Sequence, residues 1–154
     1  MNNRIIILIT GLLLSSLFIT VGTASAEPPR YLHVRSVTMA LDGPDATFNI
    51  EFELNMIAKM YVLLLGTKSM EPAIYDIFND FDNIQVLSVM EDNAVVKVMN
   101  VSYQDPEQVG NIYFHDSHNL GTTVDTFIIV FPSGVERTFS DVSTTPNTFF
   151  EALK

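Results

Sequence analysis

The sequence predicts an α+β fold: a mostly antiparallel sheet of about seven strands with a helical segment, at about 56–81, packed on one face. Three observations lead to this class. Two strand patterns come first after residue 30, a helical period follows them, and about five further strand patterns fill the rest of the chain. The alternative is an immunoglobulin-like β-sandwich with a helical insertion.

The first two strands are expected at 31–41 and 48–54, joined by an Asp-Gly-Pro-Asp turn at 42–45. In the first strand, Val34 and Val37 fall on opposite faces unless a β-bulge intervenes. The second strand alternates strictly between apolar and polar residues, with the apolar set at Phe48, Ile50, Phe52 and Leu54. We therefore expect an antiparallel hairpin with one core face and one solvated face.

A helix is expected at 55–66, where Asn55 suits the N-cap and Gly66 the C-cap. A strand through 61–65 is the alternative, because that run is continuously apolar. The expected core face of the helix is the set at helical spacing: Ile57, Met60, Tyr61, Leu64 and Leu65.

A second helix is expected after Ser69, which would be its cap, with Pro72 in the first turn. Its apolar face would consist of Ile74, Ile77, Phe78 and Phe81.

The rest of the chain has a strand pattern. A short hairpin loop at 91–93 is expected to join its first two strands, and a Pro-Ser-Gly turn at 132–134 its last two. We expect an irregular tail at 143–147. The five strands are expected at 86–90, 94–101, 112–114, 124–131 and 135–139.

The N-terminus has the three parts of a signal peptide at 1–26. Arg4 precedes an apolar run at 5–21, and Ala24-Ser25-Ala26 has the small residues that signal peptidase requires. Cleavage after Ala26 would leave 27–154 as a single extracytoplasmic domain. The alternative is an uncleaved anchor, since the run is long for a cleaved signal and shorter than the about 20 residues of a full span. Only in that case would the chain contact a membrane, through residues 5–21.

Composition narrows the classes of partner and chemistry. The formal net charge of −10 argues against nucleic acid and anionic lipid as partners. The chain has no cysteine, which excludes disulfides, thiolate metal sites and a cysteine nucleophile.

The loop at 115–118 is the strongest candidate for chemistry. His115, Asp116 and His118 supply two imidazoles and a carboxylate, which are suitable donors for a divalent metal ion such as Zn²⁺. A further protein donor would be needed, for which Asp125 and His33 are the candidates. The simpler interpretation is that both loop histidines form local hydrogen bonds.

Two other positions are weaker candidates. Asn100 begins an Asn-Val-Ser sequon, so it is a candidate glycosylation site. Glu51 and Glu53 lie on one strand face, at a spacing compatible with paired-carboxylate hydrolysis, although a solvated acidic face is the simpler interpretation.

The sequence contains no phosphate-binding loop, dinucleotide fingerprint, nucleophile elbow or His-Glu-x-x-His motif. It favours a secreted or cell-envelope, non-enzymatic domain that binds a protein or envelope component. Two alternatives stand beside it. One is a divalent-metal-binding protein or metal-dependent hydrolase that uses the loop at 115–118. The other is a membrane-tethered subunit of a surface assembly.

Overall fold

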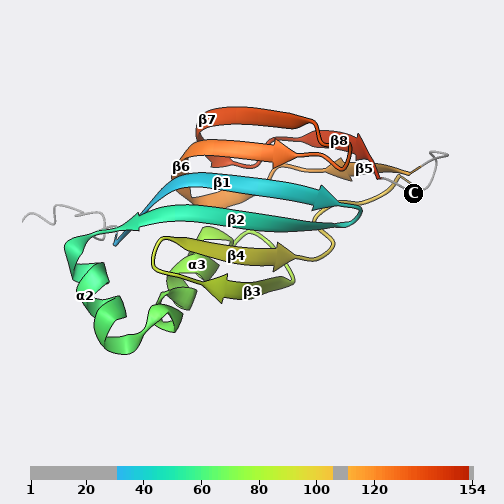
Figure 1. The fold of residues 1–154 in the computed structure, drawn as a ribbon. Coiled ribbons are helices and arrows are strands. Elements are labelled where there is room, and N and C mark those ends of the chain that lie inside the picture. Colours follow the sequence, from blue (N-terminus) through green and yellow to red (C-terminus); the bar gives the residue numbers. More distant parts are fainter. Residues whose placement is uncertain (1–30, 106–110, 153–154) are drawn as a thin grey trace, which may run out of the picture. The chain divides into compact units, whose positions relative to one another are not determined.

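The computed structural model describes residues 31–105 and 111–152. The predicted signal peptide at 1–26, with its apolar run, lies outside the described residues. Six strands form one mixed sheet in the order β3-β4-β2-β1-β6-β7, and β5 and β8 form a separate two-stranded sheet. In chain order (Figure 1) the elements are β1 (Leu32–Asp42), β2 (Asp45–Leu54), α2 (Met56–Leu65), a 3-10 turn (Thr67–Met70), α3 (Glu71–Ile77), β3 (Ile84–Val89), β4 (Asn93–Val98), β5 (Ile112–His115), β6 (Asn119–Val130), β7 (Glu136–Thr144) and β8 (Thr148–Glu151).

This architecture is mostly β with two short α-helices in the described ranges, which agrees with the predicted α+β class at a coarse level. It differs in detail. The described residues form eight strands instead of about seven, and the strands are divided six to two between the sheets. The immunoglobulin-like alternative would instead divide them into two packed sheets of similar size.

The hairpin of β1 and β2 lies at the centre of the large sheet and confirms the predicted pattern. A register shift between Val34 and Ser36 is the β-bulge that the spacing required, and it turns both Val34 and Val37 into the core. Along β2 the predicted apolar set is buried: Phe48, Ile50, Phe52 and Leu54.

One pairing in the large sheet is parallel. β6 lies beside β1, with Ser36 opposite Thr126 and Ala40 opposite Val130. The other pairings of the named strands are antiparallel. The sheet is therefore mixed. The sequence could not show this, because hydrophobic alternation indicates which face a residue occupies but not which strand lies beside it.

The C-terminal strands are longer and more numerous than the sequence predicts. β6 begins at Asn119, five residues before the predicted strand at 124–131, and β7 continues to Thr144, five residues beyond the predicted strand at 135–139. The predicted irregular tail is confirmed only at 145–147, and β8 follows it. The prediction failed because β7 is an edge strand with no fully buried residue, so it has no apolar alternation.

Gly121 lies within β6, ahead of the segment predicted as a strand. A Cβ at this position would overlap the carbonyl oxygen of Asp76 in α3. The glycine thus allows the beginning of β6 to approach the backbone of α3 closely.

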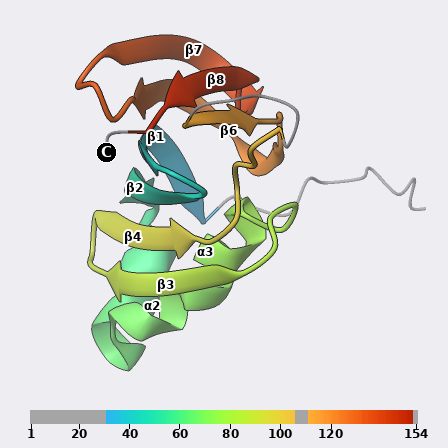
Figure 2. The same cartoon turned by 90° about the vertical axis from the view of Figure 1, so that its right-hand side faces the viewer.

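The helix α3 buries its predicted face against the sheet, beside β3 and the beginning of β6 (Figure 2). Phe48 of β2 makes edge-to-face contacts with Phe78 at 4.9 Å and with Phe81 at 5.6 Å between ring centroids. Pro72 lies in the first turn as expected. The N-cap is Met70, however, because Ser69 belongs to the preceding 3-10 turn.

The helix α2 has the predicted caps but buries a different face. The Asn55 side-chain oxygen accepts a hydrogen bond from the Ala58 N–H at 2.9 Å, and the Gly66 N–H donates to the Val62 carbonyl at 2.7 Å. The buried residues are Ala58 and Val62. The face predicted for the core is exposed to solvent: Ile57, Met60, Tyr61, Leu64 and Leu65.

This reversal has a simple cause. Apart from Lys59, every residue of α2 is apolar, so helical spacing alone fits more than one buried face. The rival prediction of a strand at 61–65 is wrong. Among the residues that the structure describes, no helix combines the length and apolar character needed to cross a bilayer.

Candidate functional site

His115, the last residue of β5, is a buried structural histidine. Its Nδ1 lies 3.0 Å from the Val101 carbonyl oxygen, and its Nε2 lies 3.0 Å from the Thr145 hydroxyl. A carbonyl oxygen only accepts, so Nδ1 carries the proton and Nε2 accepts from Thr145. Both ring nitrogens are therefore engaged within the protein.

Thr145 connects this ring to the loop at 115–118. Its hydroxyl oxygen accepts a hydrogen bond from the His118 backbone N–H at 2.9 Å, and its own N–H donates to the His118 carbonyl at 2.8 Å. The Ser117 N–H donates to the Asn147 side chain at 2.5 Å. These bonds fasten the loop to the segment between β7 and β8.

Burial lowers the pKa of His115 below its usual value of 6.5, and the charge of His118 lowers it further. The hydrogen bond to the Val101 carbonyl and the nearby charge of Asp116 oppose this shift. Desolvation is the largest effect, so the ring is neutral at physiological pH.

The His118 ring is stacked between two others. Its centroid lies 4.6 Å from that of Phe81, at an interplanar angle of 14°, and 5.4 Å from that of His115, at 22°. Its Nδ1 lies 2.8 Å from the Asp116 carbonyl oxygen, to which it donates. The two histidines thus meet face to face.

A metal site would instead need nitrogen atoms that converge on one point. Within 31–105 and 111–152, no three or more His, Cys, Asp or Glu side chains form a group that could hold a metal ion. Asp116 is an exposed loop residue. Metal binding by His115, Asp116 and His118 stays a prediction.

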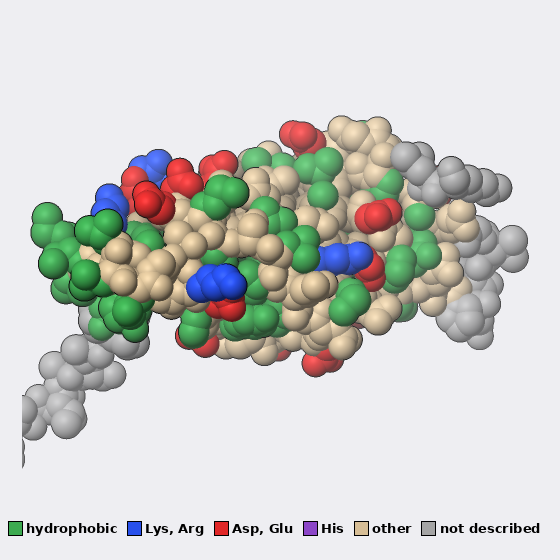
Figure 3. Space-filling view, turned by 60° about the horizontal axis from the view of Figure 1, so that its bottom comes forward, with side chains coloured by type: hydrophobic (Ala, Val, Ile, Leu, Met, Phe, Trp, Pro, Cys, Tyr) green, Lys and Arg blue, Asp and Glu red, His purple; other side chains and the backbone are tan. Residues whose placement is uncertain are grey.

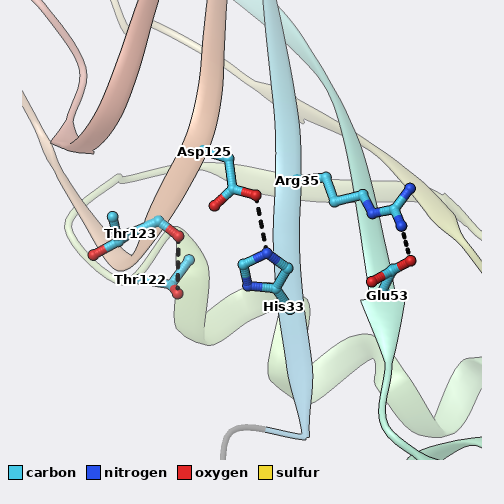
Figure 4. A network of polar contacts seen from close by, with 6 residues as sticks. All are labelled: His33, Arg35, Glu53, Thr122, Thr123 and Asp125. Carbon is cyan, nitrogen blue, oxygen red and sulfur yellow. Dashed lines mark hydrogen bonds and ion pairs between the residues drawn. The ribbon is translucent and has the colours of Figure 1, made fainter.

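The two residues considered as additional ligands, His33 and Asp125, pair with each other. His33 Nε2 on β1 lies 2.9 Å from Asp125 Oδ2 on β6, and both side chains are about half exposed (Figure 4). The structure brings these two together, and among the described residues no third His, Cys, Asp or Glu completes a metal-binding group with them.

The acidic pair on β2 is similarly engaged with β1. Arg35 forms an ion pair with Glu53 (Figure 4), and the Ser36 hydroxyl donates to Glu51 at 2.9 Å. These exposed cross-strand pairs each contribute roughly 0–1 kcal/mol to stability. These contacts agree with the simpler interpretation, in which Glu51 and Glu53 belong to a solvated face of the sheet.

Asn100 lies in an exposed turn directly after β4, with a positive φ of 56°. Its backbone N–H donates to the Asp45 side chain at 3.1 Å. The Asn100 side chain is exposed, while Ser102 of the sequon is buried. Glycosylation stays a prediction.

The most unusual surface of the described residues is one that the sequence patterns assigned to the core. We call it the apolar surface of α2. Its seven large side chains are between 53 and 85% exposed, and Figure 3 shows them as a hydrophobic end of the molecule: Met56, Ile57, Met60, Tyr61, Leu63, Leu64 and Leu65. Large contiguous apolar surfaces are typical of protein, membrane or ligand interaction sites.

Two hollows flank this surface. An apolar pocket of about 480 Å³ lies between α2, α3 and the beginning of β1, and its lining includes Tyr31, Ile57 and Tyr61. The residues that line a groove of about 520 Å³ on the other side include Lys59, Leu63, Glu91 and Asp92. The apolar surface therefore continues into concave regions on both sides of the helix.

The signal for this surface was present in the sequence. The segment Met56–Leu65 holds a single charge, and a helix that is apolar nearly all round cannot bury every side in a two-layer domain. No protein-family model matches the chain, and no curated protein matches it. The functional argument therefore depends on the surfaces described above.

Proposed function

We propose that this chain is a secreted or cell-envelope binding domain without enzymatic activity, and that it holds its partner on the apolar surface of α2. The exposure of seven large apolar side chains on one helix carries this proposal. Hydration of that much apolar surface is unfavourable, and contact with a partner would relieve it.

The polar candidates support the same conclusion. His115, Glu51 and Glu53 all have hydrogen-bond or ion-pair partners within the domain, which explains them as structural groups. None of them faces the apolar surface of α2 as an unpaired group ready for proton transfer.

The signal-like segment at 1–26 supports the extracytoplasmic location. If residues 5–21 are retained, the domain becomes a membrane-tethered subunit of a surface assembly that uses the same surface. Mass spectrometry of the native N-terminus distinguishes these forms, because cleavage would make Glu27 the first residue.

Site-specific photo-crosslinking in the native organism tests the proposed function. A benzophenone amino acid replaces Leu64 on α2 and, as a matched control, Phe149 on β8, which is 71% exposed. We expect protein or lipid adducts from position 64 that position 149 does not give. Equal labelling at both positions, or no adduct from position 64, would refute the assignment of this surface.

A further inference from the structure

We infer that the partner of the apolar surface of α2 is a lipid bilayer, into whose interface the helix inserts lengthwise. This inference rests on the proposed function and names the occupant of its surface. A second copy of the chain is the strongest rival, since seven side chains of roughly 100 Å² each approach the about 800 Å² that each partner buries in a stable complex.

The width of the apolar surface favours a bilayer. At 100° per residue, the exposed apolar positions from Leu63 through Met56 to Leu65 cover an uninterrupted arc of about 200°. A helix that packs on a protein core needs an apolar stripe of about 100° or slightly more. A bilayer interface surrounds a protruding helix on several sides at once, whereas a flat protein partner covers only one.

The charges around the helix fit the same occupant. From Asn55 to Met70 there is no acidic residue, although the whole chain has a net charge of −10. Lys59 lies at the margin between the exposed arc and the buried face, where its ammonium can reach lipid headgroups while its stem stays on apolar surface. Tyr61 supplies an amphipathic ring of the kind enriched at membrane interfaces.

The flanking acids indicate which lipid suits the surface. Glu91 and Asp92 border the groove beside Leu63, and Asp76 borders the pocket beside Tyr61. Their charges oppose an anionic bilayer. We therefore assign the surface to a zwitterionic bilayer, in which insertion of the apolar side chains holds the domain.

The chain N-terminal to the described residues gives an independent argument. Tyr31, the first described residue, lines the apolar pocket together with Ile57 and Tyr61. Nine residues, 22–30, separate Tyr31 from the apolar run at 5–21, and nine residues span at most roughly 30 Å. Where that run enters a membrane, the length of the connecting chain limits the distance of Tyr31 from the lipid to about this value.

The lack of tryptophan allows a direct test on the full chain. Leu64→Trp places a single reporter in the apolar surface, and Phe149→Trp places one on β8 as the control. Both proteins are reconstituted in phosphatidylcholine vesicles, with and without brominated acyl chains that quench tryptophan on contact. We expect blue-shifted emission and strong bromine quenching at position 64, and water-like, unquenched emission at position 149. Anionic lipid should not increase the quenching.

Three results would overturn the bilayer assignment. Water-like, unquenched emission at position 64 would show that α2 stays in solvent. Blue-shifted but unquenched emission would show that a second copy covers it. Equal quenching at positions 64 and 149 would show that the contact is not specific to α2. Leu63→Trp, at an even more exposed position, repeats the measurement if the first variant folds poorly. After any of these results, the proposed function would still stand if photo-crosslinking in the native organism gives protein adducts from position 64.

Discussion

Val62 and Leu64 lie two residues apart in α2, and the structure gives them opposite environments. Val62 is 7% exposed and contacts the core, whereas Leu64 is 79% exposed. Val62→Ala removes two buried methyl groups at roughly 0.8 kcal/mol each, and incomplete collapse of the resulting cavity raises the loss of unfolding free energy to about 2 kcal/mol. Leu64→Ala removes more carbon, but from water, so we expect a change within about 0.5 kcal/mol.

Urea unfolding followed by circular dichroism measures the difference. With a denaturant dependence of about 1–3 kcal/mol per molar urea, Val62→Ala should lower the midpoint by about 1 M, and Leu64→Ala should leave it nearly unchanged. If Leu64→Ala destabilises as much as Val62→Ala, α2 packs through the leucine face that the sequence pattern predicted. The apolar surface would then not be free, and both proposals about it would fail.

Three further predictions follow from the other contacts. Gly121→Ala should destabilise the protein by roughly 1–3 kcal/mol in thermal or urea unfolding, because its Cβ overlaps the Asp76 carbonyl, whereas Thr123→Ala on the exposed part of the same strand should be nearly neutral. Because burial lowers the pKa of His115, the unfolded chain gains a proton first as the pH falls through about 6.5, so stability should decline from there until the folded ring is also protonated. Urea midpoints on either side of pH 6.5 should show a smaller decline in His115→Gln, and an unchanged decline would assign the effect to another group. Calorimetric titration with Zn²⁺ should give no stoichiometric heat from the loop at 115–118, and a defined stoichiometry that His118→Ala removes would instead support the metal hypothesis.

The sequence predicts best where one pattern has one physical solution. In β2, strict alternation next to a turn fits only a half-buried strand, and all four predicted core residues are buried. The bulge in β1 followed from the same logic, because Val34 and Val37 could not otherwise share a face. The core face of α3 was equally well determined, because the polar residues Asp76, Asn79 and Asp80 occupy the opposite side of the predicted helix.

Prediction failed where several arrangements satisfy the same local pattern. The helix α2 is apolar on almost every side, so helical spacing alone does not select Val62 over Leu64 for the core. β7 and β8 have too few buried residues to show alternation. The metal prediction for the loop at 115–118 stays a prediction, but the sequence did not show the hydrogen-bond partners of His115, because no spacing rule connects Val101 and Thr145 to it.

The parallel contact between β1 and β6 also determines the order in which the sheet can be completed. β1 and β2 are synthesised before β6, so the edge of β1 that pairs with β6 stays open until residues 119–130 have followed. Closing this contact requires a loop of nearly the whole domain, which makes it slow. An open edge in the middle of an apolar sheet attracts strands from other chains during that delay. We therefore expect nascent copies to be most prone to pair with one another before residues 119–130 have been synthesised.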